Sequence, residues 1–482
     1  MATRLLEAGR AARREGPNGR ESETNVSLED AKRQKSMQME LRLKAIGEAE
    51  REEVSGEAST ATHEDERSGT DHLMEMVVER DNVEEALKRV MQNKGSPGID
   101  GMTVEELPKW LAENWGAVRA KLLDGTYQPK PVREVEIPKS DGGIRKLGIP
   151  TVLDRLIQQC VLLVLQPRLD PTFSQHSYGF RPGRSAHQAL EAAARYIREG
   201  RTWVVDVDLE KFFDRVNHDV LMGRLAKCIG DKRMLRLIRG YLNAGIMVDG
   251  VVMARDSGTP QGGPLSPLLA NVLLDEVDKE LEKRGHAFVR YADDCNVYVG
   301  SRRAGERVLE GLKKSFGKLR LRINESKSGV AVVTERKFLG HSFELTPEGE
   351  VHFVAAPKAL EALKQKVRAL TARAGGKSMR TVIALLSVQL RGWRQYFRLV
   401  QGTRFESLDG WIRRRLRALQ LKQWKTPQAI ARALKKLKVN ERDGRAVNAH
   451  RRSYWAVAKY PGMHKALPTQ ELHRMGLISL AR

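Results

Sequence analysis

Residues 287–299 constrain the possible folds more than any other part of the sequence. Two runs rich in β-branched and aromatic residues, 287–291 and 295–299, flank the short segment Ala292-Asp293-Asp294. Two β-prone runs separated by so short a segment predict a hairpin with the acidic residues at its turn. Strands this apolar are expected inside a sheet, where they would hold the turn rigidly.

The acidic turn is a candidate cation site. The adjacent carboxylates of Asp293 and Asp294 repel each other unless a cation lies between them, and hard oxygen ligands of this kind suit Mg²⁺. A solvated acidic turn is the alternative interpretation. A third carboxylate, Asp208, follows the buried-type run Trp203-Val204-Val205-Asp206-Val207 and is expected to project from a strand end with its backbone fixed. We interpret Asp206 and Asp214, on either side of Asp208, as structural or solvated.

The charge of the chain indicates a polyanionic partner. Its 482 residues carry a formal net charge of +23, and their 41% hydrophobic content is enough for more than one domain. Nucleic acid is the first candidate partner, and a membrane surface is the alternative. No apolar run approaches the length that spans a bilayer. The three cysteines, Cys160, Cys228 and Cys295, form no C-x-x-C pair, which argues against a zinc site or disulfide framework and fits a cytoplasmic location.

The pattern along the chain changes twice. Residues 1–70 contain no aromatic residue and few large apolar ones, so we predict a disordered N-terminal tail. Residues 71–355 mix helical and strand patterns, including an apolar helical period over 73–90 and a β-hairpin over 132–150. From residue 356 the chain is helical and basic, with helices expected at 358–373, 379–397, 404–423 and 427–439.

Several cations are candidates for phosphate binding. Lys139 and Arg145 lie near the tip of the 132–150 hairpin, where they would either be solvated or close on a polyphosphate. Arg181 and Arg184 alternate with aromatic residues in a Gly/Arg loop that suits a nucleic-acid backbone, although surface arginines at a helix entry fit equally well. The remaining candidates for RNA contact lie in the basic C-terminal part: Arg413, Arg414, Arg415 and Arg417. Trp393 and Phe397, an i,i+4 pair, are predicted to be core residues.

Taken in order from about residue 73 to the C-terminus, these motifs resemble the bacterial group II intron-encoded reverse transcriptases, also called maturases. The resemblance is greatest to the short forms of group IIC introns, which lack an endonuclease domain. It implies an α+β fold: a right-hand polymerase whose fingers and palm, with an antiparallel palm sheet, precede an α-helical thumb or maturase region. The implied parts are fingers and palm over 71–355, a thumb (maturase X domain) over 356–410, and a basic D-like nucleic-acid-binding region over 411–482. Residues 1–70 lie outside the family pattern.

The resemblance also assigns roles to single residues. Asp208, Asp293 and Asp294 match the catalytic carboxylates that hold two Mg²⁺ ions, for which Mn²⁺ can substitute. The implied nucleotide-binding residues are Lys139 and Arg145 at the triphosphate, Phe213 as the aromatic gate against a ribose 2′-hydroxyl, Gln261 under the incoming nucleotide, and Lys327 in a later palm block. The segment Lys337-Phe338-Leu339-Gly340 matches the part that grips the primer.

The implied function is RNA-directed DNA polymerisation of the intron by Mg²⁺-dependent nucleotidyl transfer, together with binding of the intron RNA to assist splicing. The implied partners are group II intron RNA, a DNA primer or target, and deoxynucleoside triphosphates, with no membrane. The implied location is the bacterial cytoplasm, in a nucleoid or ribonucleoprotein complex. One alternative is a splicing-only maturase with a vestigial polymerase site, against which the three carboxylates, Gln261 and both hairpin cations count. Another is a retron-like or diversity-generating enzyme, which the long basic C-terminal part disfavours. The third is an RNA-templated RNA polymerase, against which Phe213 counts.

Overall fold

The computed structural model describes residues 72–138, 144–248, 251–253, 258, 262–372, 376–449 and 453–482. The predicted N-terminal tail lies outside these residues. The chain forms two compact units. The first takes residues up to 165 with 225–255 and 260–265, and the second takes 166–224, 256–259 and 266–482.

The first unit combines helices with a four-stranded sheet of strand order β2-β1-β4-β5. The predicted hairpin over 132–150 is confirmed, because β1 and β2 pair antiparallel with Ile137 opposite Arg145. β1 also pairs in parallel with β4. The elements are α2 (Leu73–Val78), α3 (Arg80–Asn93), α4 (Leu107–Leu123), β1 (Val132–Pro138), β2 (Ile144–Ile149), most of α5 (Val152–Leu169), α9 (Lys232–Asn243), β4 (Ile246–Val248) and β5 (Val251–Met253).

The apolar period over residues 73–90 belongs to two helices, where the sequence predicts one. Glu79 between α2 and α3 has extended backbone angles, with φ −60° and ψ 140°. The Met74 N–H donates to Asp231, 3.0 Å away. Leu73, Val77 and Val78 are buried beside it. Periodicity reports which side chains are apolar, and the direction of the chain after Val78 depends on tertiary contacts such as that with Asp231.

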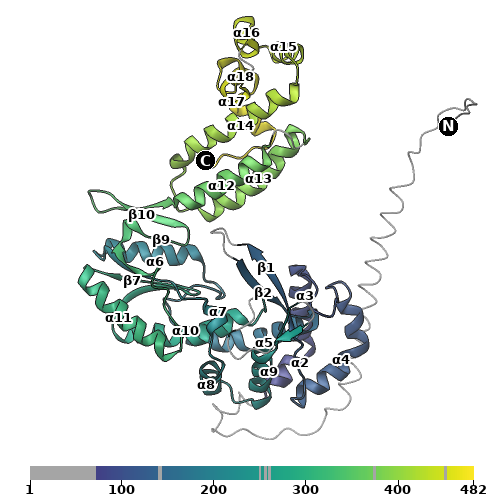
Figure 1. Ribbon diagram of the computed structural model, residues 1–482, viewed down its shortest axis with the longest axis vertical. Coiled ribbons are helices and arrows are strands. Elements are labelled where there is room, and N and C mark those ends of the chain that lie inside the picture. The colour runs from purple at the N-terminus through teal and green to yellow at the C-terminus, as the bar shows by residue number, and fades with distance from the viewer. Residues whose placement is uncertain are drawn as a thin grey trace, which may run out of the picture. The chain divides into compact units, whose positions relative to one another are not determined.

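The second unit contains the palm sheet, with strand order β6-β7-β3-β8 and antiparallel pairing throughout (Figure 1). The hairpin predicted at 287–299 is confirmed as β6 and β7, with Tyr291 paired to Asp294. The elements up to the end of this sheet are η2 (Asp170–Thr172), α6 (Ala186–Arg198), β3 (Trp203–Val207), α7 (Phe212–Arg215), α8 (His218–Cys228), α10 (Ser266–Lys283), β6 (Ala287–Tyr291), β7 (Asp294–Val299), α11 (Arg302–Lys318) and β8 (Gly329–Val332).

The two faces of the palm sheet carry different helices. Val204 and Val289 share a buried cluster with Ala189, Ala193 and other side chains of α6. The opposite face contacts α11, since a Cβ on Gly305 would come within 2.5 Å of Val330 and 3.4 Å of Val205. Because side chains alternate along a strand, Asp206 projects on the α6 side and Val205 on the α11 side. The helix α6 itself begins with a capping box between Ser185 and Gln188, which fixes its start as predicted.

A second, three-stranded sheet of order β11-β10-β9 follows the palm. Leu339 and Gly340 form a tight turn between its first two strands, with φ values of 49° and 74°. His341 after this turn is fully buried, 4.6 Å from the Phe397 ring between centroids. The Tyr396 hydroxyl donates to the Leu339 carbonyl at 3.0 Å, which joins this turn to the first helices of the C-terminal part. The elements are η3 (Val333–Glu335), β9 (Lys337–Phe338), β10 (His341–Leu345) and β11 (Val351–Ala355).

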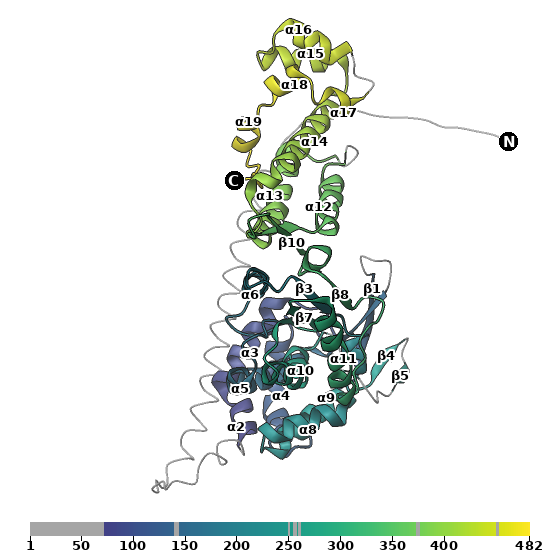
Figure 2. The same ribbon diagram turned by 90° about the vertical axis from the view of Figure 1, so that its left-hand side faces the viewer.

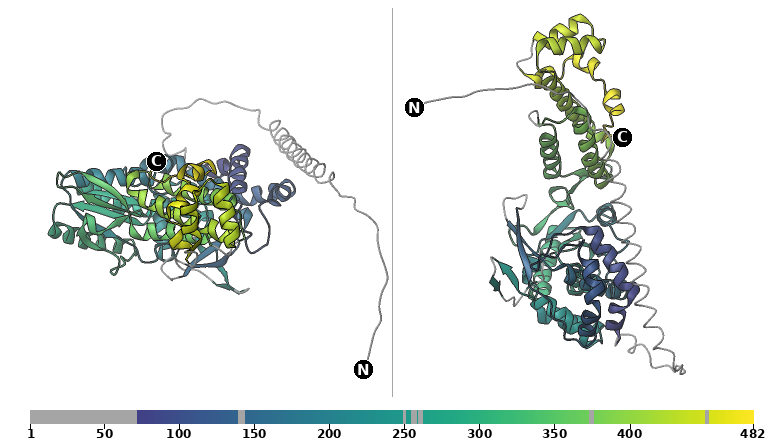
Figure 3. Two further views of the ribbon diagram at one scale, coloured as in Figure 1. Left: turned by 90° about the horizontal axis from the view of Figure 1, so that it is seen from above. Right: turned by 90° about the vertical axis from the view of Figure 1, so that its right-hand side faces the viewer.

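The part after β11 is helical, as the sequence predicts (Figures 2 and 3, green to yellow). Trp393 and Phe397 are core residues as predicted, with ring centroids 4.4 Å apart and Phe397 buried. α14 runs without a break across the predicted boundary at 410/411, and it contributes Ile412 to one hydrophobic cluster and Leu421 to another. The helices are α12 (Pro357–Leu370), α13 (Met379–Tyr396), η4 (Gly402–Phe405), α14 (Glu406–Trp424), α15 (Pro427–Lys436), α16 (Glu441–Ala449), α17 (Tyr454–Val457), α18 (Pro461–Ala466) and α19 (Thr469–Arg474).

Among the helices that the structure describes, none has both the length and the apolar character needed to cross a membrane.

Candidate active site

The acidic turn between β6 and β7 has a strained backbone held by a close contact. Ala292 adopts a left-handed conformation with φ 58°, which is uncommon for a residue with a Cβ. A Cβ on Gly179 would lie 2.2 Å from the Ala292 nitrogen, so the 179 backbone presses against the turn in a way that only glycine allows. The turn that presents Asp293 and Asp294 is therefore fixed by its surroundings as well as by the two strands.

Arg290 is the central support of this turn. Its side chain is 2% exposed and forms a bidentate pair with Asp278 of α10, whose side chain is fully buried. The Arg290 Nε lies 2.8 Å from Asp278 Oδ1, and its Nη2 lies 2.6 Å from Oδ2. Its Nη1 donates to the Ala292 carbonyl and to Asn271 Oδ1, each at 2.9 Å. Asn271 in turn donates to the Gly179 carbonyl at 3.0 Å. One buried guanidinium thus ties the helix α10 to the turn.

Asp208 is held at the end of β3 by backbone hydrogen bonds on both sides. Its N–H donates to Ser328 Oγ at 2.9 Å, and its carbonyl accepts from the Asn324 N–H at 2.8 Å. The Lys327 ammonium lies 3.6 Å from Asp208 Oδ2 and is 60% exposed, so it is a mobile partner. The predicted nucleotide-binding residue Lys327 is therefore beside the predicted catalytic carboxylate.

The neighbouring carboxylates contribute to a raised pKa of Asp294. Burial, which disfavours the charged form, and the negative charges of Asp293, Asp208 and Asp206 together raise the pKa of Asp294 to about 7, while Lys327 opposes the rise. Asp294 is nevertheless exposed to solvent. Three predicted catalytic residues are thus within electrostatic reach of one another, and their excess negative charge is only partly compensated.

Asp206 lies below the catalytic carboxylates on the same face of the sheet. Burial raises its pKa to about 6, with Asp208 adding to the rise and Arg336 opposing it. The Arg336 Nη1 lies 3.6 Å from Asp206 Oδ2 and also donates to the Lys327 carbonyl at 3.1 Å. The structural role predicted for Asp206 fits this pairing.

The donor chemistry of the site fits a divalent cation. Within the described ranges, no set of three or more His, Cys, Asp or Glu side chains is assembled closely enough to hold a metal ion. Carboxylate oxygens are nevertheless the ligands that Mg²⁺ and Mn²⁺ prefer. A bound cation would also remove the repulsion that raises the pKa of Asp294. Asp208, Asp293 and Asp294 are the residues that would hold it.

The other predicted nucleotide-binding residues are described to different extents. Lys139 and Gln261 lie outside the described residues, and Arg145 is described only as a backbone position in β2. Phe213 in α7 is half-buried, edge-on to Phe212 with centroids 5.0 Å apart. The position of Phe213, five residues after Asp208, remains consistent with a gate beside the catalytic carboxylates.

Two predicted nucleic-acid contacts are corrected. The Arg181 guanidinium is buried, 2.9 Å from Asp170 and bound to the carbonyls of Ser174 and Ser177. Arg417 is buried and donates to the Leu467 carbonyl at 3.0 Å. Both arginines join segments of the protein, so their guanidinium groups are not presented to a partner.

The other predicted arginines are only partly buried, and three of them form contacts within the protein. Arg414 stacks on the Trp455 ring at 3.9 Å and donates twice to the Trp455 carbonyl. Arg415 donates to the Thr371 hydroxyl at 2.6 Å. The list is completed by Arg184, which lies over the Tyr178 ring at 5.6 Å, and Arg413, which is half-buried on α14. Nucleic-acid contact by these four residues stays a prediction.

The supports of the catalytic turn are the functional residues that sequence reasoning missed. Arg290, Asp278 and Asn271 received no role from the sequence pattern. A signal was present, because an arginine within the otherwise apolar run 287–291 must find a buried acid. The acid lies on α10, an element that the local pattern cannot place next to β6.

An antiparallel sheet with carboxylates grouped at one hairpin turn, followed along the chain by a helical part, is typical of a reverse transcriptase fold. Residues 137–343 match the family model described as reverse transcriptase (RNA-dependent DNA polymerase), and residues 360–438 match the group II intron maturase-specific domain. The chain belongs to the group II intron-encoded reverse transcriptase and maturase family.

Curated relatives support this assignment. Protein YkfC of Escherichia coli is 33% identical over 311 residues, which are 56% of this chain and 82% of the relative. The group II intron-encoded protein LtrA of Lactococcus lactis is 40% identical over 202 residues, which are 40% of this chain and only 32% of LtrA. A solved structure, a partial Cas6-RT-Cas1–Cas2 complex, is 27% identical, covers 51% of this chain and 42% of its own, and has a TM-score of 0.34. That superposition is too loose to inform the geometry.

Proposed function

We propose that this protein is an RNA-directed DNA polymerase that copies group II intron RNA and also binds that RNA to assist splicing. The observation that carries the polymerase proposal is the grouping of Asp208, at the end of β3, with Asp293 and Asp294 on a turn fixed by Arg290. Uncompensated carboxylates destabilise a fold, so stability alone does not favour this arrangement. Strongly raised carboxylate pKa values on a rigid support are typical of functional sites.

Two divalent cations bound by these carboxylates would supply activation of a primer 3′-oxygen and charge neutralisation at the leaving pyrophosphate. The protein's own contribution is positioning. Arg290 and Gly179 fix the backbone of the turn, and Ser328 and Asn324 fix the backbone of Asp208. Phosphoryl transfer depends mainly on such positioning and on charge, because little covalent help is required from the protein.

The remaining residues would select the substrate. In this proposal Lys139 and Arg145 bind the triphosphate, Gln261 lies under the incoming nucleotide, and Phe213 excludes a ribose 2′-hydroxyl. Lys327 partly neutralises the negative charge of Asp208 before a substrate enters. Deoxynucleoside triphosphates and a DNA primer or target are the implied substrates.

Primer extension tests the polymerase proposal directly. The assay uses an RNA template, an annealed DNA primer, deoxynucleotides and Mg²⁺ or Mn²⁺, and compares the parent protein with Asp293→Ala/Asp294→Ala. We expect extension by the parent only, with the circular dichroism spectra of both proteins unchanged. Extension by the folded double variant would refute the assignment of the catalytic turn.

The maturase part of the proposal rests on the match of residues 360–438 to the maturase-specific domain. Splicing of the intron at low Mg²⁺, with and without the protein, measures this activity. A splicing-only protein is the alternative, and it predicts tight RNA binding and splicing assistance with no primer extension by the parent. We place the protein in the bacterial cytoplasm, where its three free cysteines, two of them buried, stay reduced.

A further inference from the structure

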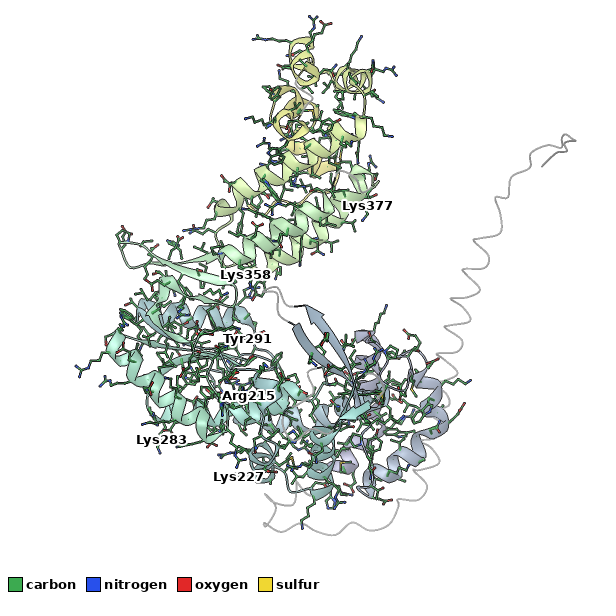
Figure 4. The ribbon with its side chains drawn as sticks, viewed as in Figure 1. Arg215, Lys227, Lys283, Tyr291, Lys358 and Lys377 are labelled. Atoms are coloured by element: carbon green, nitrogen blue, oxygen red, sulfur yellow. The ribbon has the colours of Figure 1, made fainter. Side chains whose placement is uncertain are left out.

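A cationic stripe runs along the outer side of α11, away from the catalytic turn. Arg303, Arg307, Lys314 and Lys318 recur at helical spacing on one side of this helix, and all four are exposed. Together with Arg284, which follows α10, they line a hollow of about 600 Å³ over Gly311 and Ser315. We call these five side chains the α11 track. Lys283, labelled in Figure 4, marks the end of α10 beside Arg284, and in that view it lies apart from Tyr291 at the catalytic turn.

Glu306 and Glu310 also line this hollow, and both have ion-pair partners outside the track. Glu306 pairs with Arg302 at 3.0 Å, and Glu310 pairs with Lys313 at 2.8 Å. Arg284 pairs with Glu280 on its own helix. Within the part of the chain that the structure describes, Arg303, Arg307, Lys314 and Lys318 have no carboxylate within ion-pair distance. The hollow is lined by five cations and two carboxylates, so it keeps a surplus of positive charge that favours an anionic ligand.

The track suits an extended polyanion better than a single phosphate group. A second hollow of about 370 Å³ shares Arg284 and Arg307 with the first and adds Arg201, so the cationic surface continues beyond α11. From Arg303 to Lys318 the helix alone rises about 22 Å, at 1.5 Å per residue. Gly311 leaves room for Arg284, whose Nη1 would lie 3.1 Å from a Cβ at that position.

The chemistry of the surface argues against a membrane. Helices that lie in a bilayer interface insert apolar side chains beside their cations. Among the described residues, the exposed large hydrophobic side chains lie elsewhere, and none belongs to α10 or α11. A hollow lined mainly by arginine and lysine suits a sugar-phosphate backbone, which is recognised by charge without base-specific contacts.

We propose that the α11 track binds RNA through its backbone, as a second contact separate from the polymerising site. The proposal rests on the proposed function, in which the protein handles a long intron RNA. α11 packs on the Val205 face of the palm sheet, whereas Asp206 and the catalytic carboxylates project on the other face. RNA on the track therefore does not compete with a template and primer at the carboxylates. The protein can hold one part of an RNA while it copies another.

The test compares two variants that lose the same charge. The track variant carries Arg303→Gln, Arg307→Gln, Lys314→Gln and Lys318→Gln. The control variant replaces four exposed lysines on other helices of the chain: Lys109→Gln, Lys121→Gln, Lys227→Gln and Lys232→Gln. Each protein is titrated with the structured intron RNA over a salt series, and each is assayed for extension of a short pre-annealed template and primer. Thermal melting confirms that both variants fold.

We expect the track variant to bind the long RNA at least about tenfold more weakly than the parent at 150 mM salt. The slope of log affinity against log salt should fall by about three, since four phosphate contacts are lost. The control variant should change much less, and extension of the short substrate should be unchanged in both. Track-specific loss of RNA affinity supports the proposal even if the parent fails to extend a primer, so the polymerase and the track are tested separately.

Other outcomes would overturn it. Equal losses in the track and control variants would show that only net charge matters. Unchanged RNA binding by the track variant would remove the site. If the track variant lost binding to single-stranded DNA of the same length as strongly as it lost binding to RNA, the ligand would be nucleic acid in general. If the track variant lost binding to vesicles of anionic phospholipid but kept its RNA binding, the ligand would be a lipid surface.

Discussion

Replacing Arg290 with methionine tests whether a buried ion pair positions the catalytic turn. The change removes the guanidinium but keeps most of the side-chain volume. It leaves Asp278 buried without its counter-ion, and it leaves the Ala292 carbonyl and Asn271 without a donor. Removing one partner of a buried pair costs about 3–5 kcal/mol of unfolding free energy. That is a large fraction of the ~5–15 kcal/mol that stabilises a typical domain.

The cost should depend on pH, because Asp278 can take up a proton. Burial raises the pKa of Asp278 above its ordinary value of 3.8, and Arg290 opposes that rise. Without Arg290 the pKa rises further in the folded state, whereas the unfolded chain still ionises near 3.8. The folded variant then holds a proton that the unfolded chain releases, so stability falls as pH rises above about 4. The variant should therefore be closer to the parent at pH 5 than at pH 8 in urea unfolding.

A double variant separates stability from positioning. Arg290→Met with Asp278→Leu replaces the ion pair by apolar side chains, a change that is often neutral or stabilising. We expect the double variant to recover most of the lost unfolding free energy but to remain at least about tenfold slower in primer extension, because the Ala292 carbonyl has still lost its donor. The KM for the deoxynucleotide should change less than kcat. Full recovery of extension by the double variant, or a single variant within about 1 kcal/mol of the parent, would refute the positioning role.

Three further variants probe the site. In EDTA, Asp294→Asn should melt at a higher temperature than the parent at pH 8 but not near pH 4. The reason is the raised pKa of about 7, because of which the folded parent loses stability as the pH rises from about 4 to 7. Added Mg²⁺ should stabilise the parent only. Gly179→Ala should slow primer extension by at least about a hundredfold, because its Cβ would meet the Ala292 nitrogen at 2.2 Å and displace the turn; parent-like rates would show that the turn adapts. Phe213→Ala should raise incorporation of ribonucleotides relative to deoxynucleotides, and unchanged discrimination in single-nucleotide extension would remove the gate assignment.

The palm hairpin could be predicted because its cause is local. β-prone residues on both sides of Ala292-Asp293-Asp294 leave the chain little choice except a tight reversal. The left-handed conformation of Ala292 could not be predicted, since alanine has no preference for it and the contact with Gly179 comes from a distant loop. The sequence therefore locates the acidic turn of the proposed catalytic site but does not reveal what fixes that turn.

The roles of the arginines show the same limit more sharply. Arg181 and Arg417 have the sequence context of nucleic-acid contacts, yet both are buried and bind protein carbonyls. Charge and neighbouring aromatic residues are the same for an arginine that joins two helices and for one that binds phosphate. Only the presence of an internal acceptor, such as the Leu467 carbonyl fifty positions away from Arg417, distinguishes them.

The boundary between domains also depends on packing that composition does not show. The predicted boundary at 410/411 follows a change in composition, but α14 is continuous there and its residues from Leu408 to Leu421 serve two hydrophobic clusters. The first cluster also contains Leu472, Leu477 and Leu480 from the C-terminal end. Because a long helix can belong to two cores at once, composition alone cannot say where one ends.

The charges at the centre of the palm form two networks with opposite properties. The Arg290–Asp278 pair is buried and internally balanced, so it contributes geometry without adding net charge to the catalytic turn. The predicted catalytic carboxylates have the exposed Lys327 beside Asp208, and their negative charges contribute to the raised pKa of Asp294. If Arg290 faced the carboxylates, it would neutralise them permanently and weaken their affinity for Mg²⁺. Because Arg290 is paired with Asp278, it holds the turn rigid without neutralising the acidic site. The proposed active site requires both properties, since it would bind and release cations with each nucleotide.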